Sequence, residues 1–134
     1  MMISSKGRYA LRVMIDLAEH DPQRYIPLKE IAQRQNISEK YLEIIIKSLS
    51  KNHFVEGLRG KGGGYRLVRK PETYTIASIL EISEGTLAPV SCLSDDSQIL
   101  PIWEGLYKVV KDYLENITLD ELTEAGHIGN DYII

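Results

Sequence analysis

Apolar residues recur every three or four positions along much of this chain, a pattern that predicts α-helices with one buried face. The first predicted helix runs from Ser5 to Glu19, where Tyr9, Val13 and Leu17 share a face, and Asp21-Pro22 ends it. The same period returns in several later segments. The chain is therefore predicted to be mainly helical.

Two short helices are predicted to follow in close succession. One extends from Leu28 to Gln35 and the next from Glu39 to Lys51, with Ser38 as the N-cap of the second. Only Asn36-Ile37-Ser38 separates them. Two short helices joined by so tight a turn are typical of a helix-turn-helix motif.

The pattern changes after the third predicted helix. Residues Phe54 to Arg59 predict a strand, Tyr65 to Val68 predict a return strand, and the glycine-rich run 60–64 predicts the turn between them. A helix-turn-helix followed by a two-stranded hairpin is the winged-helix arrangement. The predicted fold class is therefore mainly α with a small β-hairpin wing.

The C-terminal half predicts a fourth helix from Thr75 to about Ser83, a long helix over about 99–116, and a short last helix opened by a capping box at 118–121. The long helix has a wide apolar stripe but follows a domain that is already complete. We therefore expect it to form a subunit interface, although it could instead fold back on its own domain. The expected interface residues are Ile99, Ile102, Trp103, Leu106, Val110 and Tyr113.

Charge is divided unevenly along the chain, whose net charge is −3. Residues 1–70 hold seven Lys and seven Arg against seven acidic residues, whereas residues 71–134 hold two Lys against twelve acidic residues. A basic half joined to an acidic half suggests a polyanion-binding module attached to a second element. Chance clustering of solvated surface charge is the alternative.

The basic half contains the residues expected to contact double-stranded DNA. A recognition helix enters the major groove by its N-terminal end, where Glu accepts from cytosine and Lys donates to guanine or phosphate. A glycine hairpin can lie against the backbone and direct an arginine into the minor groove. A helix N-terminus is a natural phosphate site. The candidates are Ser38, Lys40, Tyr41, Glu43 and Lys47 on the third helix, Arg59, Gly60 and Lys61 on the wing, and Ser5, Lys6, Arg8 and Tyr9 at the N-terminus.

Three separated motifs resemble one family of bacterial winged-helix transcriptional regulators, the family that includes IscR, NsrR and CymR. They are Ser5-Lys6-Gly7-Arg8-Tyr9-Ala10, Ile37-Ser38-x-x-Tyr41-Leu42-Glu43 and Arg59-Gly60-x-Gly62-Gly63-Gly64-Tyr65. The resemblance implies a homodimer on a palindromic operator, joined through the long helix. It also implies that Glu43 reads the major groove and Arg59 the minor groove. The iron–sulphur member of the family has serine at the position of Lys40, so base preference is expected to differ.

The resemblance also divides the chain into functional parts. A DNA-binding winged helix-turn-helix is expected over 1–85, a sensor-type loop over 86–98, the dimerisation helix and short last helix over 99–125, and a tail over 126–134.

The sensor loop departs from the cluster-binding members of the family, which have two further cysteines after the position of Cys92. This chain has one cysteine, and its histidines are His20, His53 and His127, without metal-ligand spacing. An iron–sulphur centre needs about four ligands, chiefly thiolates. We therefore expect no 2Fe-2S cluster and no other metal site. Cys92 is interpreted as a vestigial loop residue, as a redox-responsive thiol, or as part of some other ligand site.

The tail ends in Asp131-Tyr132-Ile133-Ile134, which is similar to the isoleucine-ended tail of serine acetyltransferases. That tail inserts into O-acetylserine sulfhydrylase (cysteine synthase), and the cysteine-metabolism repressor of the family also pairs with that enzyme. The resemblance implies that Tyr132, Ile133 and Ile134 dock on cysteine synthase. An ordinary apolar terminus is the alternative.

These observations predict a sequence-specific transcriptional regulator, expected to repress genes of cysteine or sulphur metabolism. The alternatives are a redox or iron–sulphur-homeostasis regulator working through Cys92, and a winged-helix protein–protein adaptor. The sequence contains no nucleophile–base motif of the kind that would indicate an enzyme. Neither a signal peptide nor an apolar run of roughly 20 residues is present, so a cytoplasmic protein without a membrane partner is expected.

Overall fold

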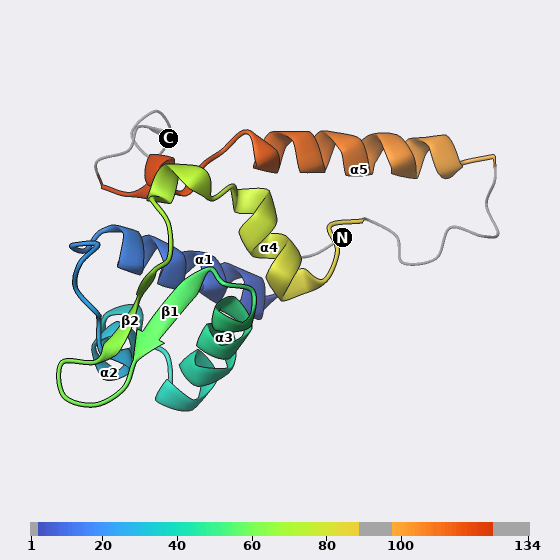
Figure 1. The fold of residues 1–134 in the computed structure, drawn as a ribbon. Coiled ribbons are helices and arrows are strands. Elements are labelled where there is room, and N and C mark those ends of the chain that lie inside the picture. The colour runs from blue at the N-terminus through green and yellow to red at the C-terminus, as the bar shows by residue number, and fades with distance from the viewer. Residues whose placement is uncertain (1–2, 89–97, 125–134) are drawn as a thin grey trace.

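The computed structural model describes residues 3–88 and 98–124. Four helices, α1 (Ser5–Ala18), α2 (Leu28–Gln35), α3 (Glu39–Lys51) and α4 (Ile76–Glu84), pack with a small hairpin around one core, and α5 (Leu100–Glu115) lies across the far end (Figure 1). The predicted fold class is confirmed. Cys92, most of the predicted loop 86–98 and the tail 126–134 lie outside the described residues.

Local capping explains why the helix-turn-helix has the predicted bounds. The Ser38 side chain accepts a hydrogen bond from Tyr41 N at 3.1 Å and so satisfies a free N–H in the first turn of α3. Asn36 ends α2 in the left-handed conformation with φ 53°, which asparagine tolerates well. Thr75 caps α4 in the same way as Ser38, accepting from Ser78 N at 3.1 Å.

The wing consists of β1 (Val55–Leu58) and β2 (Gly64–Leu67), paired antiparallel with Val55 opposite Leu67. β1 is shorter than predicted, because Phe54 and Arg59 lie outside the ladder, and β2 begins and ends one residue earlier than predicted, with Gly64 inside the ladder and Val68 outside it. The ladder extends sideways instead, since Ile26 and Tyr65 exchange backbone hydrogen bonds of 2.8 Å in each direction. Gly64 permits this approach: its φ is 148°, and a Cβ there would lie 2.2 Å from the Ile26 carbonyl oxygen.

The base of the wing is held by Tyr74, whose side chain is completely buried. Its hydroxyl donates to the Phe54 carbonyl oxygen at 2.8 Å and accepts from the backbone N–H groups of Val68 and Arg69 at 3.2 and 3.0 Å. One side chain thus satisfies backbone groups on both sides of the hairpin. Tyr74 follows the short 3-10 helix η1 (Pro71–Thr73), so the wing is anchored to the segment that leads into α4.

A buried carboxylate joins α1 to α2. Asp16 accepts from Arg34 through Nε and Nη2 at 3.0 and 2.9 Å, and from Gln35 Nε2 at 2.8 Å. A buried charge is stable only when it is paired and hydrogen-bonded, and Asp16 meets both conditions. The first helix of the helix-turn-helix therefore has a defined position on α1.

The last element is a single 3-10 turn, η2 (Leu119–Leu122), so the short last helix is smaller than expected. The predicted capping box is confirmed, with Thr118 N donating to Glu121 Oε2 at 2.7 Å. Ile76 N donates to the Ile117 carbonyl oxygen and Leu119 N to that of Tyr74, both at 2.9 Å. The chain after α5 thus returns to the start of α4.

Candidate nucleic-acid interface

The N-terminal end of α3 and the tip of the wing lie at the same end of the molecule, away from α5 (Figure 1). The buried face of α3 consists of Leu42, Ile45, Ile46 and Leu49. On the other face Lys40, Glu43 and Lys47 are exposed. The predicted base-reading residues therefore lie on a free helix surface, as a recognition helix requires.

Two of the predicted contact residues also have a structural part. The rings of Tyr9 and Tyr41 meet edge to face, with centroids 5.7 Å apart and an interplanar angle of 89°. The Arg12 guanidinium lies over the Tyr9 ring, 4.9 Å from its centroid. Both tyrosines are half-buried, so they fix α3 against α1 beside the predicted contact surface.

The wing tip presents two exposed cations, Arg59 and Lys61, on either side of Gly60. Gly60 has φ 90°, and a Cβ built there would meet nothing within 4 Å. Glycine is therefore needed at this position for its backbone conformation, and the tip has room for a close approach by another molecule.

The cations of this end lack acidic partners within the described part of the chain, whereas three other cations of the basic half are paired. Arg34 bonds Asp16 and Glu30, Arg24 bonds Glu30, and Arg66 bonds Glu56. These partners raise the pKa of Arg34 and of Arg66 above the ordinary value, through the hydrogen bonds that the two arginines donate to Asp16 and Glu56 respectively. The described ion pairs include none of the predicted DNA-contact cations, Lys6, Arg8, Lys40, Lys47, Arg59 and Lys61.

The N-terminus of α1 differs from the expected open phosphate site. Ser4 is its N-cap, and Ser4 N and Oγ donate to Glu84 Oε1 at 2.9 and 2.7 Å. The α4 carboxylate thus already lies at this helix N-terminus. Any phosphate contact here is left to the side chains of Ser5, Lys6 and Arg8, and Arg8 Nη2 already donates to Ser5 Oγ at 3.0 Å. Sequence analysis could not identify Glu84, because it lies 80 positions from Ser4.

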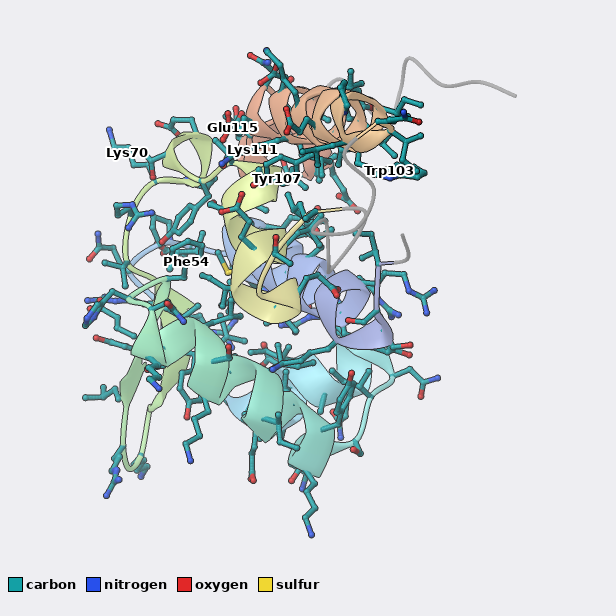
Figure 2. The ribbon with its side chains drawn as sticks, turned by 90° about the vertical axis from the view of Figure 1, so that its right-hand side faces the viewer. Phe54, Lys70, Trp103, Tyr107, Lys111 and Glu115 are labelled. Atoms are coloured by element: carbon teal, nitrogen blue, oxygen red, sulfur yellow. The ribbon has the colours of Figure 1, made fainter. Side chains whose placement is uncertain are left out.

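The apolar stripe of α5 divides between two directions. Tyr107 and Leu114 pack against the core of their own domain, and Figure 2 shows Tyr107 and Lys111 between α5 and α4. Val109, Ile102 and Tyr113 are 67%, 61% and 58% exposed. Of the six expected interface residues, Ile99, Ile102, Leu106 and Tyr113 are exposed, while Trp103 and Val110 are half-buried.

One side of α5 therefore folds back on its own domain, as the alternative interpretation has it, while the other side is exposed and the subunit interface stays a prediction. Val109 was not among the expected interface residues, although it is the most exposed of the large apolar residues. The spacing 102, 106, 109, 113 places it on the exposed stripe and could have identified it.

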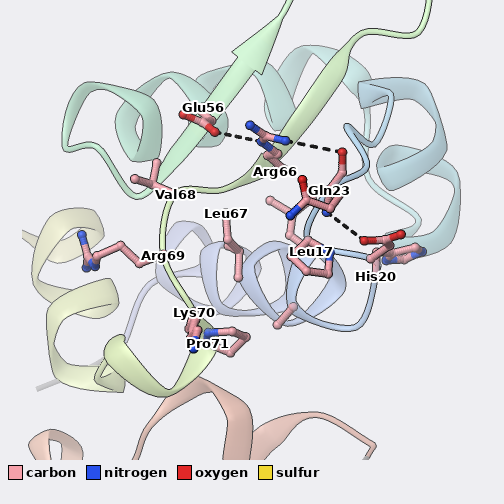
Figure 3. Close-up of a pocket in the computed structure, with 13 residues that line it drawn as sticks. Leu17, His20, Gln23, Glu56, Arg66, Leu67, Val68, Arg69, Lys70 and Pro71 are labelled. Carbon is pink, nitrogen blue, oxygen red and sulfur yellow. Dashed lines mark hydrogen bonds and ion pairs between the residues drawn. The ribbon is translucent and has the colours of Figure 1, made fainter.

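A cavity of about 450 Å³ lies beside the base of the wing (Figure 3). Arg66 donates there to Glu56 Oε1 at 2.8 Å and to the Gln23 carbonyl oxygen at 3.4 Å. Gln23 N donates to Asp21 Oδ1 at 2.8 Å. Four of the polar residues that line this cavity, Asp21, Gln23, Glu56 and Arg66, therefore bond one another, and the cavity lies apart from the tip of the wing.

Comparison with known proteins decides the family. The model of the Rrf2 family, described as iron-dependent transcriptional regulators, matches residues 3–125. The chain belongs to the Rrf2 family. Among its relatives, the HTH-type transcriptional regulator CymR of Bacillus subtilis is 38% identical over 91% of this chain and 89% of its own length. IscR of Pectobacterium atrosepticum is 34% identical over 97% of this chain and 84% of its own.

Solved structures of Rrf2-family members have the same fold. The structure described as CymR, the global cysteine regulator of B. subtilis, has a TM-score of 0.81 at 37% identity and covers 91% of this chain and 95% of its own. An oxidized form of Staphylococcus aureus CymR has a TM-score of 0.76 at 33% identity, and the match covers 100% of this chain and 99% of that one. This chain is thus a DNA-binding transcriptional regulator with a winged helix-turn-helix, and its named relatives are regulators rather than enzymes.

The family description mentions iron, but the donor residues of this chain do not fit an iron–sulphur cluster. The whole sequence contains one cysteine. Within 3–88 and 98–124, no group of three or more His, Cys, Asp or Glu could hold a metal ion. In the same residues, no helix has the length and apolar character to cross a membrane.

Proposed function

We propose that this Rrf2-family chain is a repressor that binds a palindromic operator as a homodimer and blocks the promoter by occupying it. The observation that carries the proposal is the set of cations on α3 and the wing that have no acidic partner in the described structure. Unpaired cations attract phosphates at no cost of breaking an internal ion pair.

Each side chain has a role in this proposal. Glu43 accepts from a cytosine amino group, and Lys40 donates to guanine or phosphate. Arg59 enters the minor groove while Gly60 keeps the wing close to the backbone. Phosphates are contacted by the remaining candidates, Ser5, Lys6, Arg8, Ser38, Lys47 and Lys61.

The exposed stripe of α5 supports the homodimer. Ile102, Leu106 and Val109 present aliphatic surface to solvent on a helix that lies far from the DNA-binding end (Figure 1). Pairing with the same stripe of a second copy would bury this surface and leave both recognition helices free. Two half-sites related by a two-fold axis follow from such a pairing.

The regulated genes belong to cysteine or sulphur metabolism in this proposal, because the similar CymR of B. subtilis is described as a global cysteine regulator. Cysteine synthase is the proposed partner of Tyr132, Ile133 and Ile134. Deleting these three residues should abolish complex formation with that enzyme and leave DNA binding by the regulator alone intact. A complex that survives the deletion would contradict the role of the tail.

Redox control through Cys92 is the second candidate, favoured by the oxidized form in which the similar S. aureus CymR is known. We further propose that the chain works without an iron–sulphur cluster, because one cysteine cannot supply about four ligands. An iron and acid-labile sulphide assay on protein purified without oxygen tests this. A stoichiometric cluster would refute it.

Selection of bound fragments from random duplex DNA at two salt concentrations tests the function. We expect one enriched palindrome and an affinity that falls steeply with salt. No enrichment, or salt-independent binding, would favour a protein–protein adaptor.

On the selected operator, Arg59→Ala should lower affinity at least tenfold and relax the preference at the minor-groove positions. Lys70→Ala is the matched control, because it removes an exposed cation that lies away from α3 and the wing tip (Figure 2). Unchanged affinity for Arg59→Ala would refute the assignment of the wing.

A further inference from the structure

One large aliphatic residue on α3 contributes nothing to the core. The Ile44 side chain is 53% exposed, whereas its neighbours Ile45 and Ile46 are buried. Ile44 does not belong to the partly buried apolar residues that pack against the core within the described chain. The buried stripe of α3 is complete without it.

The position of Ile44 on the helix places it among the unpaired cations. At 100° per residue, Ile44 lies nearly opposite the centre of the buried stripe and between Lys40 and Lys47, one turn before and after it. Both lysines are exposed, and Glu43 is exposed beside them. An aliphatic side chain thus lies within the surface that faces DNA in the proposed function.

We propose that Ile44 reads thymine, by van der Waals contact with the C5 methyl group in the major groove. Thymine is the base that presents a methyl group there, and an aliphatic side chain cannot use the hydrogen-bonding edges of the other bases. A branched isoleucine loses side-chain freedom in a helix, so it is a costly choice for a surface position without a partner.

The neighbouring Glu43 gives this contact a sequence context. Glu43 is one residue away and accepts from a cytosine amino group in the proposed function. Glu43 and Ile44 are separated by about 1.5 Å along the helix axis and about 100° around it, so the bases that they reach should lie one or two base-pair steps of about 3.4 Å apart. Each half-site should therefore contain a cytosine and, within two steps of it, a thymine whose methyl group faces α3.

The test removes the two sides of the proposed contact separately: the thymine methyl group from the DNA and the Ile44 side chain from the protein. Each thymine of the selected operator is replaced in turn by deoxyuridine, which lacks only the C5 methyl, and the affinity of the full-length chain is measured by fluorescence anisotropy. We expect about a fourfold loss at one position of the half-site, and about fifteenfold when both half-sites are changed, from the usual value of a buried methyl group.

The protein arm uses Ile44→Ala, an exposed change to the best helix former, so the fold should be unaffected. Ile44→Ala should bind the thymine operator more weakly than the wild type does. The variant should bind the thymine and deoxyuridine operators with equal affinity. Lys47→Ala should instead weaken binding to both operators by the same factor. Val68→Ala is the matched aliphatic control, since Val68 is also exposed but lies outside the contact surface, and it should change neither affinity.

The inference rests on DNA binding by α3, and the two can fail separately. Specific binding that is indifferent to deoxyuridine at every position would overturn the role of Ile44 and leave the proposed function standing. If the Ile44→Ala variant still bound the thymine operator more tightly than the deoxyuridine operator, that result would also overturn the role of Ile44. If the chain binds no duplex specifically, the proposed function fails first, and this assignment with it.

Discussion

The two ends of the molecule use their apolar residues in opposite ways. In the DNA-binding part, α1 to α4 and the wing bury nearly the whole core, including Met14, Ile31 and Ile79. In α5 no residue is fully buried, although the helix is as long as any in the protein. The first part therefore completes its own core, whereas α5 leaves one face for another surface.

Charge follows the reverse distribution. On α5, Lys108 bonds Asp112 at 2.6 Å, and Lys111 lies 3.9 Å from both Glu115 and Glu81. The hydrogen bond to Asp112 raises the pKa of Lys108, and the pKa of Lys111 is raised first by Tyr107 and then by Glu81 and Glu115. At the DNA-binding end Lys40, Lys47, Arg59 and Lys61 have no such partners among the described residues. One end thus offers apolar surface with balanced charge, and the other offers charge over a closed core.

Charging the open face of α5 should have the largest effect. Ile102→Asp combined with Val109→Asp should produce monomers, because the carboxylates would have to be buried without partners. Loss of bivalent binding should lower operator affinity by about a hundredfold. Light scattering and operator titration measure both. Lys108→Ala on the same helix should remain dimeric, and a dimeric double variant would refute the assignment of this face.

Removing the Tyr74 hydroxyl should have the next largest effect. Tyr74→Phe leaves the Arg69 N–H without its partner in the described chain and leaves the Phe54 carbonyl and the Val68 N–H with only their mutual hydrogen bond of 3.3 Å, at a cost of about 2 kcal/mol in the free energy of unfolding. Denaturant unfolding measures this change. Tyr113→Phe is the matched control on the exposed face of α5, where no change is expected. Equal effects at both tyrosines would mean that the two ends do not differ in this way.

The smallest expected effect concerns pH. The hydrogen bond from Arg34 lowers the pKa of Glu30 below its ordinary value of 4.5. Because the folded value is depressed, this pair stabilises the fold above about pH 4.5 and loses that contribution as pH falls through the folded value. Glu30 is partly exposed, so the contribution should stay below about 1 kcal/mol.

Glu30→Gln removes this titration. The variant should therefore be less stable than the wild type at neutral pH and should approach it in acid, as measured by unfolding at pH 7 and pH 3. Glu104→Gln, an exposed change on α5, should show no such convergence. A constant difference for Glu30→Gln at both pH values would contradict the pairing.

Local signals account for what could be predicted from the sequence. The bounds of α2 and α3 depend on Ser38 and Asn36, which act within a few residues, and both helices have the predicted ends. The bonds between Ile26 and Tyr65 were not predicted, because they join positions far apart in the chain. The contact of Glu84 with Ser4 was missed for the same reason.

The candidate site shows the same limit. The exposed placement of Lys40, Glu43 and Lys47 follows from the helical period and was predicted. Periodicity alone could not divide the apolar residues of α5, because Val109 and Leu114 belong to one wide stripe in sequence but face different surroundings in the fold. Which side met α4 depended on packing over a long sequence separation.

The attachment of the wing has a consequence for control. Ile26 holds β2 on one side and Tyr74 holds the base of the hairpin on the other, so the hairpin and α3 form one rigid DNA-binding unit. A rigid unit presents one fixed surface to DNA. In the proposed homodimer, two such units joined through α5 would bind only operators whose half-sites have the same spacing as the two recognition helices. A change in the α5 pairing would then alter which half-site spacings are bound and leave the base preference within each half-site unchanged.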